Sequence, residues 1–469
     1  MWRFLERIIA QMVTLIVSIV LARILVLDDY GAVSVIMIFI NFCNILVTHG
    51  FNSSLIQKKD ADKIDFSTAF FANLFITAVL FIVLFFSSPL IATYFDIPIV
   101  SPLLRVMALR IPFTAINSVQ SAYVSRNLQF KKYFVATIVG TLVSGAIGIV
   151  MAYNDFGAWA LVGQYLSSTI INTVVLWFVV KWRPCMCFSL QRAKIMLSYS
   201  SKILLSSLLD EVNLELSSFA IGKKYSSADL AYYNRGKQFP QIINTNVNDT
   251  ITGIMFPVLS REQSDCQLVK LHMRKVLKAS AFIMFPLLLG MAAVSREFLL
   301  ILLTDKWIEA VSYMQIFCIS CLFRPINSLN IQAVKAMGYS GKYLKTTFIK
   351  TICSITVILC LLPFGVIWVA VAGIINSLVA TFIQSLPLKK IISYSFFQEI
   401  RDLFPTFMLS AVMAVIVYCV EFLKLPLMIS LIVKIVVGVI FYVVLAKICK
   451  FESFDYLINI LLKKKRKNR

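Results

Sequence analysis

Apolar segments long enough to cross a lipid bilayer recur from one end of this sequence to the other. Hydrophobic residues make up 59% of the 469 residues, and the mean hydropathy is +0.84. A helix needs about 20 mainly apolar residues to cross a bilayer, where every backbone hydrogen bond must be made within the protein. The sequence therefore predicts an all-α polytopic membrane protein, with no polar region long enough to form a separate soluble domain.

The apolar segments divide into about fourteen predicted transmembrane helices. Their approximate ranges are 6–27, 31–55, 66–94, 102–125, 134–153, 158–180, 200–222, 230–257, 276–302, 310–333, 346–362, 366–386, 403–423 and 427–447. The connecting loops are short. Membrane enzymes that polymerise or ligate lipid-linked sugars usually need a large external loop, so short loops argue against an enzyme of that kind.

Basic residues are concentrated in alternate loops, and they give the chain a net charge of +22. Cytoplasmic loops of membrane proteins carry an excess of Lys and Arg, so the pattern predicts that both termini lie in the cytosol. The basic run at 463–467 can also bind anionic membrane lipids. We expect no nucleic-acid partner, because no basic soluble fold exists to carry one.

The chain contains an internal repeat. The tripeptide Ile-Asn-Ser occurs at 116–118 and again at 326–328, each time inside an apolar segment. A Phe-Gly pair near a tryptophan follows at 156–159 and at 364–368. Equivalent helices are an even number of positions apart in the order of helices. They therefore point the same way across the membrane and form a parallel repeat.

The repeat predicts two lobes of six helices each around a central path. We expect an N-terminal lobe at 1–182, a cytosolic linker at 183–199, and a C-terminal lobe at 200–390. The last two helices and a basic cytosolic tail, at 391–469, have no counterpart in the repeat.

An arginine precedes the tripeptide in both copies, but at different positions. Aligned on Ile-Asn-Ser, Arg324 corresponds to Thr114, and Arg110 corresponds to Ser320. Positions four residues apart lie on nearly the same helical face and differ by about 5 Å in depth. The repeat therefore predicts positive charge at two heights along the path.

Polar residues inside the predicted helices are the candidate ligands of a substrate. They are Arg324, Arg110, Arg235, Lys237, Arg23, Asn327 and Asn117. A charge at the centre of a membrane helix costs about 2.5–3.5 kcal/mol on insertion scales, so we expect Arg324, the deepest, to face a water-filled cavity. Near helix ends, a side chain that reaches back to the interface is an alternative interpretation.

Three acidic residues, Asp210, Glu211 and Glu215, lie in the predicted helix 200–222. Glu211 and Glu215 share one helical face, because they are four residues apart. A buried carboxylate pair can carry a proton or a sodium ion. The same residues can instead neutralise Arg235, Lys237 or Arg324, and the sequence leaves both interpretations open.

Cysteine and histidine usage predicts neither disulfides nor a metal site. Most of the ten cysteines lie inside predicted helices, and the two histidines, His49 and His272, are isolated from each other. No cofactor is expected.

Several short motifs, taken in order, resemble one family of transporters. They are FLERIIAQ at 4–11, LARIL at 21–25, DYG at 29–31, AYYNR at 231–235, FPVLSR at 256–261, FPLLLG at 285–290 and KW at 306–307. Together they resemble the polysaccharide-transporter branch of the multidrug/oligosaccharidyl-lipid/polysaccharide (MOP) flippases. The resemblance is nearest to the Wzx-type exporters of the colanic-acid and teichuronic-acid kind.

The resemblance implies a two-lobed, MATE-like fold and a function in surface polysaccharide or lipopolysaccharide biosynthesis. It implies that the chain moves an undecaprenyl-diphosphate-linked oligosaccharide across the bacterial cytoplasmic membrane by alternating access. It also implies that the chain has no catalytic residue and works beside other polysaccharide-assembly proteins. Arginine fits this substrate, because a guanidinium group binds phosphate oxygens in a bidentate manner.

Two other functions fit parts of the sequence. A cation-coupled multidrug exporter has the same fold, but it binds cationic compounds, whereas the candidate path here contains several bases. An integral-membrane enzyme of polysaccharide assembly is the third alternative, which the short loops and scarce histidine disfavour.

Overall fold

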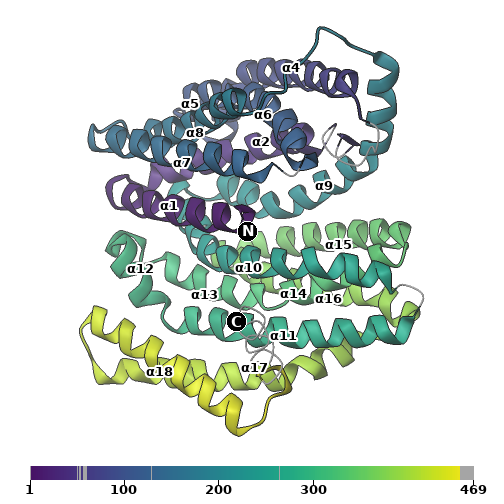
Figure 1. Ribbon diagram of the computed structural model, residues 1–469. Helices are drawn as coiled ribbons and strands as arrows, with labels where there is room; N and C mark the ends of the chain where they lie inside the picture. The colour runs from purple at the N-terminus through teal and green to yellow at the C-terminus, as the bar shows by residue number, and fades with distance from the viewer. Residues whose placement is uncertain are drawn as a thin grey trace, which may run out of the picture. The chain divides into compact units, whose positions relative to one another are not determined.

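The computed structural model describes residues 2–49, 51, 54–55, 61–127, 129–262 and 265–454 (Figure 1). These residues form seventeen α-helices and three short 3-10 helices, and no strand occurs among them. Nine helices in this part of the chain are long and apolar enough to cross a membrane. The all-α polytopic prediction is confirmed, whereas the number of fourteen transmembrane helices stays a prediction.

The chain divides into two compact units, Met1–Ala231 and Tyr232–Arg469. These units are defined by how the helices pack, whereas the predicted lobes at 1–182 and 200–390 are defined by the sequence repeat. The predicted lobe boundaries therefore stay predictions, and each unit is described separately below.

Helices of the first unit pack around an aromatic core. They are α1 (Trp2–Ile24), α2 (Leu27–His49), α4 (Lys63–Phe95), α5 (Val100–Ala108), α6 (Arg110–Arg126), α7 (Phe130–Tyr153), α8 (Ala158–Val179) and α9 (Leu190–Lys224). Helix α7 packs along α8 and α1, α6 packs against α4 and α8, and α9 packs against α2 and α4. In the core, the Phe66 ring centroid lies 5.7 Å from that of Tyr123 and 5.8 Å from that of Trp182.

Helix α10 (Ser227–Arg261) leads into the second unit. The other helices of this unit are α11 (Cys266–Ala293), α12 (Ser295–Leu303), α13 (Ala310–Cys321), α14 (Arg324–Ala336), α15 (Ser340–Leu361), α16 (Val366–Ile391), α17 (Phe396–Cys419) and α18 (Leu427–Ile448). Helix α16 packs against α13, α14 and α15, and α17 lies between α11 and α18 (Figure 1). The Tyr442 hydroxyl donates to the Phe282 carbonyl at 2.8 Å and fixes α18 to α11.

Two predicted helices of the repeat are each broken in two. The segment predicted at 102–125 consists of α5 and α6, and the segment predicted at 310–333 consists of α13 and α14. Proline has no N–H and clashes with the carbonyl four residues earlier. The first half ends at that residue in both cases, at Ala108 before Pro112 and at Cys321 before Pro325.

The helix predicted at 200–222 begins ten residues earlier, so part of the expected linker at 183–199 is helical. Ser189 caps α9, because its side chain accepts a hydrogen bond from the Arg192 backbone N–H. The Arg192 guanidinium also lies 2.6 Å from Asp62 and 3.2 Å from Asp65 at the start of α4. Its hydrogen bond lowers the pKa of Asp62 to about 2.

The turn from α1 to α2 packs against the turn from α9 to α10. A Cβ atom on Gly31 would lie 2.2 Å from the Ser227 carbonyl oxygen, so only glycine permits this approach. The Ser227 hydroxyl donates to the Asp28 carboxylate across the same contact. The two turns stand at corresponding places in the repeat.

Candidate functional site

Arg110 is the first residue of α6, and it is held against α8. Its Nε donates to Thr169 Oγ1 at 2.9 Å, and its Cζ lies 5.8 Å from the Tyr165 ring centroid. Its Nη1 is buried and has no hydrogen-bond partner among the described residues. Arg110 thus joins two helices of the first unit, and its Nη1 nitrogen is left over.

Asn117 lies two turns further along α6 and continues this polar contact. Its Nδ2 donates to Asn172 Oδ1 on α8 at 2.7 Å, and its Oδ1 accepts from the Ser121 hydroxyl at 3.0 Å. Both ends of the Asn117 amide are therefore bonded inside the first unit.

Arg324 is the first residue of α14, and its side chain is half-buried. No hydrogen bond or ion pair to its guanidinium occurs within the part of the chain that the structure describes. The Arg324 and Lys237 cations both act electrostatically on the buried Cys321 thiol. The structure thus brings two of the predicted basic residues, one from α14 and one from α10, into the same neighbourhood.

Asn327 and Ser328 follow one turn after Arg324. The Asn327 Oδ1 atom is buried and has no hydrogen-bond partner among the described residues. Asn248 Nδ2 of α10 donates to Ser328 Oγ at 2.6 Å. The first turns of α14 are therefore attached to α10 through Ser328, while the Asn327 carbonyl oxygen keeps its acceptor capacity.

Arg235 is 5% exposed and packs beneath an aromatic ring. Its Cζ lies 4.8 Å from the centroid of the fully buried Trp307, and its Nη1 donates to Gln238 at 2.7 Å. Burial, and secondarily the nearby Arg235 charge, lower the pKa of Lys306. These contacts make Arg235 part of the packing at the start of α10.

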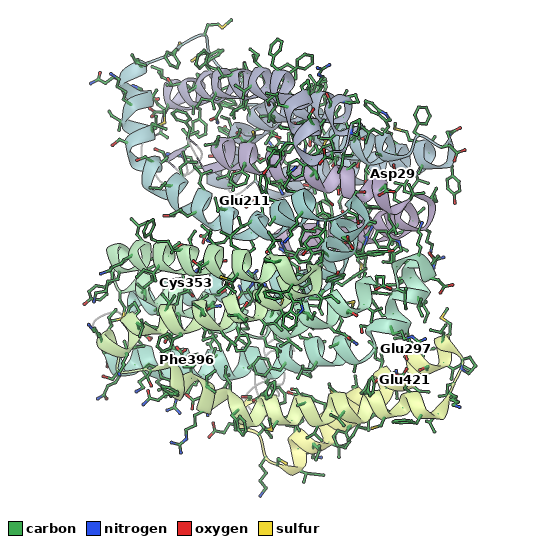
Figure 2. The ribbon with its side chains drawn as sticks, turned by 180° about the vertical axis from the view of Figure 1, so that it is seen from behind. Asp29, Glu211, Glu297, Cys353, Phe396 and Glu421 are labelled. Carbon is green, nitrogen blue, oxygen red and sulfur yellow. The ribbon has the colours of Figure 1, made fainter. Side chains whose placement is uncertain are left out.

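Arg23 and the acidic cluster belong to the first unit. Arg23 lies in the last turn of α1 and is exposed. Asp210, Glu211 and Glu215 are half-buried on α9 (Figure 2 labels Glu211), and Asn41 donates to Glu215 at 3.0 Å. The choice between cation binding and neutralisation of Arg235, Lys237 or Arg324 stays open, because those bases belong to the other unit.

Metal-ligating residues form no group of three or more in the described ranges.

A buried ion pair in α18 was not predicted from the sequence. Lys434 is 1% exposed, and its Nζ donates to Glu297 of α12, which also accepts from Ser430 at 3.3 Å. Glu421 lies 3.9 Å from Lys434, and Figure 2 shows both glutamates at the same end of the second unit. The insertion cost that singled out Arg324 applies also to Lys434, which is followed by twelve uncharged residues in α18.

Comparison with known proteins gives consistent matches. Residues 20–312 match the model of a family described as "Polysaccharide biosynthesis protein". The teichuronic acid biosynthesis protein TuaB of Bacillus subtilis (strain 168) is 25% identical over 63% of this chain and 62% of its own length. The succinoglycan biosynthesis transport protein ExoT of Rhizobium meliloti (strain 1021) is 24% identical over 64% of this chain and 61% of its own length.

The lipopolysaccharide biosynthesis protein WzxC of Escherichia coli (strain K12) is 24% identical over 70% of this chain and 68% of its own length. The chain spans about three fifths of the length of TuaB and ExoT.

Solved structures with the same fold are flippases and multidrug transporters. The inward closed conformation of the lipid II flippase MurJ matches 94% of this chain and 98% of its own, with a TM-score of 0.76 and 14% identity. An inward-facing MATE family transporter of the MOP superfamily matches 82% of this chain and 94% of its own, with a TM-score of 0.67 and 14% identity.

Where these names state an activity, it is transport for ExoT and lipid flipping for MurJ. The resemblance to Wzx-type exporters is confirmed by the family match and the relatives. The chain belongs to the polysaccharide biosynthesis protein family, as a multi-pass membrane protein with the MurJ- and MATE-like fold.

Proposed function

We propose that this protein moves a polyprenyl-diphosphate-linked oligosaccharide, with undecaprenol as the lipid, across the bacterial cytoplasmic membrane. Its family, the transport function named for ExoT and the fold shared with a lipid II flippase support this proposal. Two six-helix lobes would expose the path alternately to the two sides, with both termini in the cytosol. Other polysaccharide-assembly proteins would supply and consume the substrate.

The observation that carries the proposal is the arrangement at the start of α14. Arg324 has no anionic partner among the described residues, and it shares its neighbourhood with Lys237. The N-terminus of a helix also favours an anion, because its first N–H groups carry partial positive charge. A diphosphate therefore has a guanidinium, an ammonium group and a helix dipole of favourable sign within one small region.

The other predicted residues would have supporting roles. Asn327, whose carbonyl oxygen keeps its acceptor capacity, suits a sugar hydroxyl. Arg110, Arg235, Arg23 and Asn117 would contribute positive potential and polar surface. Asp210, Glu211 and Glu215 would bind the coupling cation, H+ or Na+.

A reconstituted transport assay tests the proposal. Purified protein in liposomes would be supplied with a fluorescent polyprenyl-diphosphate-linked oligosaccharide, and its arrival at the opposite leaflet would be followed by quenching. We expect Arg324→Ala to lower transport roughly tenfold or more. Arg324→Lys should restore part of it, because lysine keeps the charge but loses the fork of donors. Arg401→Ala, an exposed arginine on α17, is the matched control. Normal transport by Arg324→Ala would exclude Arg324 as a substrate ligand.

The alternative of a cation-coupled multidrug exporter is supported by the likeness to MATE transporters. The two functions differ in the charge of the substrate. Efflux of a cationic dye from the same liposomes, without transport of the lipid-linked oligosaccharide, would favour the exporter.

A further inference from the structure

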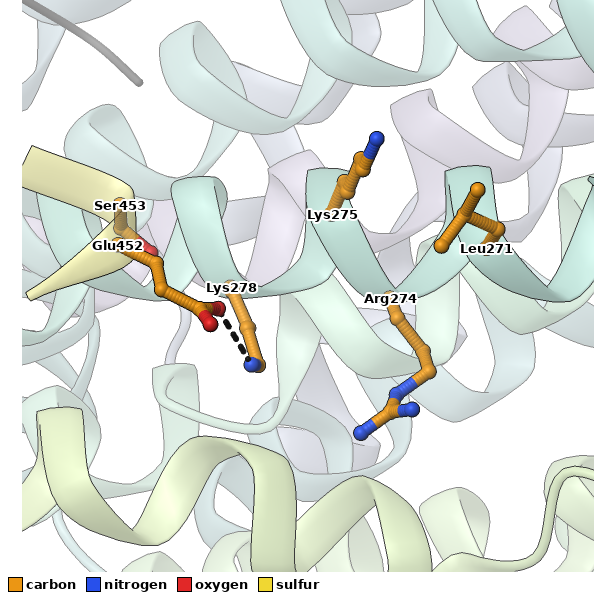
Figure 3. A pocket seen from close by; sticks show the side chains of 6 residues that line it. All are labelled: Leu271, Arg274, Lys275, Lys278, Glu452 and Ser453. Atoms are coloured by element: carbon orange, nitrogen blue, oxygen red, sulfur yellow. Dashed lines mark hydrogen bonds and ion pairs between the residues drawn. The ribbon is translucent and has the colours of Figure 1, made fainter. Parts of the chain in front are cut away.

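A pocket of about 460 Å³ lies in the second unit, between the first half of α11 and the residues that follow α18 (Figure 3). Its lining consists of Leu271, Arg274, Lys275, Lys278, Glu452 and Ser453. Three of these six residues are basic, and all three come from the first half of α11. None of them belongs to the candidate path described above.

The pocket lies where the charged ends of three helices meet their apolar spans. In α11, charged residues stop at Lys278, and 279–293 contains none. In α17, they stop at Asp402, and 403–420 contains none. In α18, 435–446 contains none, and charge returns at 447. Such a change of polarity marks the depth of the lipid head groups, so the pocket is at that depth.

One wall of the pocket is held in place by a bidentate ion pair and a tyrosine hydrogen bond. Arg274 Nε donates to Asp402 Oδ2 at 2.7 Å, and the Tyr394 hydroxyl donates to the same carboxylate at 2.8 Å. The Asp402 side chain is 9% exposed and the Arg274 side chain is 45% exposed, so water reaches the guanidinium while two hydrogen bonds to one carboxylate hold it in place. Arg274 therefore supplies a fixed cation and is not free to rearrange.

The opposite side of the pocket is held weakly. Lys278 Nζ lies 3.1 Å from Glu452 Oε2, but the Glu452 side chain is 85% exposed (Figure 3). An exposed ion pair of this kind contributes only about 0–1 kcal/mol. Lys275 is exposed and forms no ion pair within the described ranges. In Figure 3 the Lys275 side chain points away from Lys278 and Glu452. A stronger anion that replaces the Glu452 carboxylate can therefore gain Lys275 as a second cation once this exposed side chain turns toward it.

We propose that this pocket binds the phosphate of an anionic phospholipid, with Lys275 and Lys278 as its cationic ligands and Glu452 displaced. A phosphate at this depth is attached to acyl chains that can lie along the neighbouring apolar surface, where Val439 and Val443 of α18 are exposed. Free phosphate offers the same anion without those chains. The proposal does not depend on the proposed transport function.

Native mass spectrometry of the full-length protein tests this site. Detergent-solubilised protein would be titrated with phosphatidylglycerol and, separately, with phosphatidylcholine. We expect a clear preference for phosphatidylglycerol in the wild type. The double variant Lys275→Gln/Lys278→Gln should lose roughly tenfold in phosphatidylglycerol affinity, since each basic residue near an anionic lipid contributes a factor of about five or less. The double variant Lys389→Gln/Lys390→Gln, which removes two exposed lysines at the end of α16, should keep the wild-type preference.

The Glu452→Gln variant provides a test with the opposite sign. Removal of the competing carboxylate should raise phosphatidylglycerol affinity several-fold, while Glu309→Gln, at an exposed position outside the pocket, should leave it unchanged. This gain of binding keeps the proposal testable even where the lysine variant fails to fold. An unchanged phosphatidylglycerol preference in both pocket variants would overturn the proposal. Inorganic phosphate that competes fully at millimolar concentration would overturn its lipid source and assign the pocket to a soluble anion.

Discussion

The two broken helices, α5–α6 in the first unit and α13–α14 in the second, have the same design and different contacts. Each is interrupted four residues before a proline, and each resumes at an arginine, Arg110 or Arg324. The break in the second unit therefore lies later in the repeat than the break in the first unit, and so do its proline and its arginine. Aligned on Ile-Asn-Ser, the break and its proline lie three residues later in the second copy and the arginine four residues later, so the stagger of the arginines follows the displacement of the break.

The difference lies in what each arginine touches. Arg110 reaches Thr169 of α8, and the aligned residue in the second unit, Ser320, bonds the Ser377 hydroxyl of α16 at 2.9 Å. Aligned on the Phe-Gly pair, Ser377 corresponds to Thr169. The same contact between helices is thus made by an arginine in one unit and by a serine in the other.

Arg324 stands one turn beyond that contact and has no corresponding partner among the described residues. Its guanidinium therefore keeps the donors that Arg110 uses to join α6 to α8. The comparison indicates that a repeated arginine can be structural in one copy and available for a ligand in the other.

The first prediction separates the two arginines by activity. We expect Arg324→Ser to lower transport roughly tenfold or more, because a hydrogen bond to a charged group contributes about 1.5–3 kcal/mol and 1.4 kcal/mol is a factor of ten. Arg110→Ser, which gives the first unit the residue that the second has at this position, should retain most of the transport. The liposome assay measures both, at matched protein incorporation. Equal losses in the two variants would mean that both arginines bind the substrate.

The second prediction separates the two asparagines by stability. Asn117→Ala removes two hydrogen bonds and leaves Asn172 Oδ1 without its donor, so we expect a loss of about 1–3 kcal/mol. Asn327→Ala removes a buried oxygen that has no partner among the described residues, so we expect little change in stability. Thermal unfolding in detergent, followed by tryptophan fluorescence, gives both Tm values. A drop in Tm for Asn327→Ala as large as that for Asn117→Ala would contradict the comparison.

Hydropathy was sufficient to predict the helical class, because a backbone inside a bilayer has few ways to satisfy its hydrogen bonds. It did not predict the breaks at Leu109 and at 322–323, because a proline in a membrane helix can either bend the helix or end it. The choice depends on neighbouring helices, which no local pattern describes. The start of α9 at Leu190 was missed for a different reason, since Gln191, Arg192 and Lys194 interrupt the apolar residues of its first turns and only the Ser189 cap marks the start.

The candidate site was predictable as a set of residues, but not as a set of contacts. The insertion cost identifies Arg324 and Arg110 alike, and it would have identified Lys434 had it been applied to α18. It cannot say which charge is already satisfied. The partners of Arg110 and Lys434 are Thr169 and Glu297, which lie far away in sequence and become neighbours only through the packing of the helices.

The last prediction concerns the prolines that set the two breaks, and its effect is the smallest. Replacement of Pro112 or Pro325 by alanine restores an N–H that can bond the carbonyl of Ala108 or Cys321 and make the helix continuous. We expect each change to shift stability by about 1 kcal/mol or less, because the regained hydrogen bond is offset by greater freedom of the unfolded chain.

The two variants should nevertheless differ in transport. The start of α6 is also held by the Arg110–Thr169 bond, so Pro112→Ala should leave the position of Arg110 unchanged. At the start of α14 the Arg324 side chain has no such bond among the described residues, so a continuous helix would rotate its guanidinium away from its present direction. We therefore expect Pro325→Ala to reduce transport several-fold at an unchanged Tm, and Pro112→Ala to leave it near the wild-type rate. Equal transport by the two variants would show that the proline at the second break does not direct Arg324.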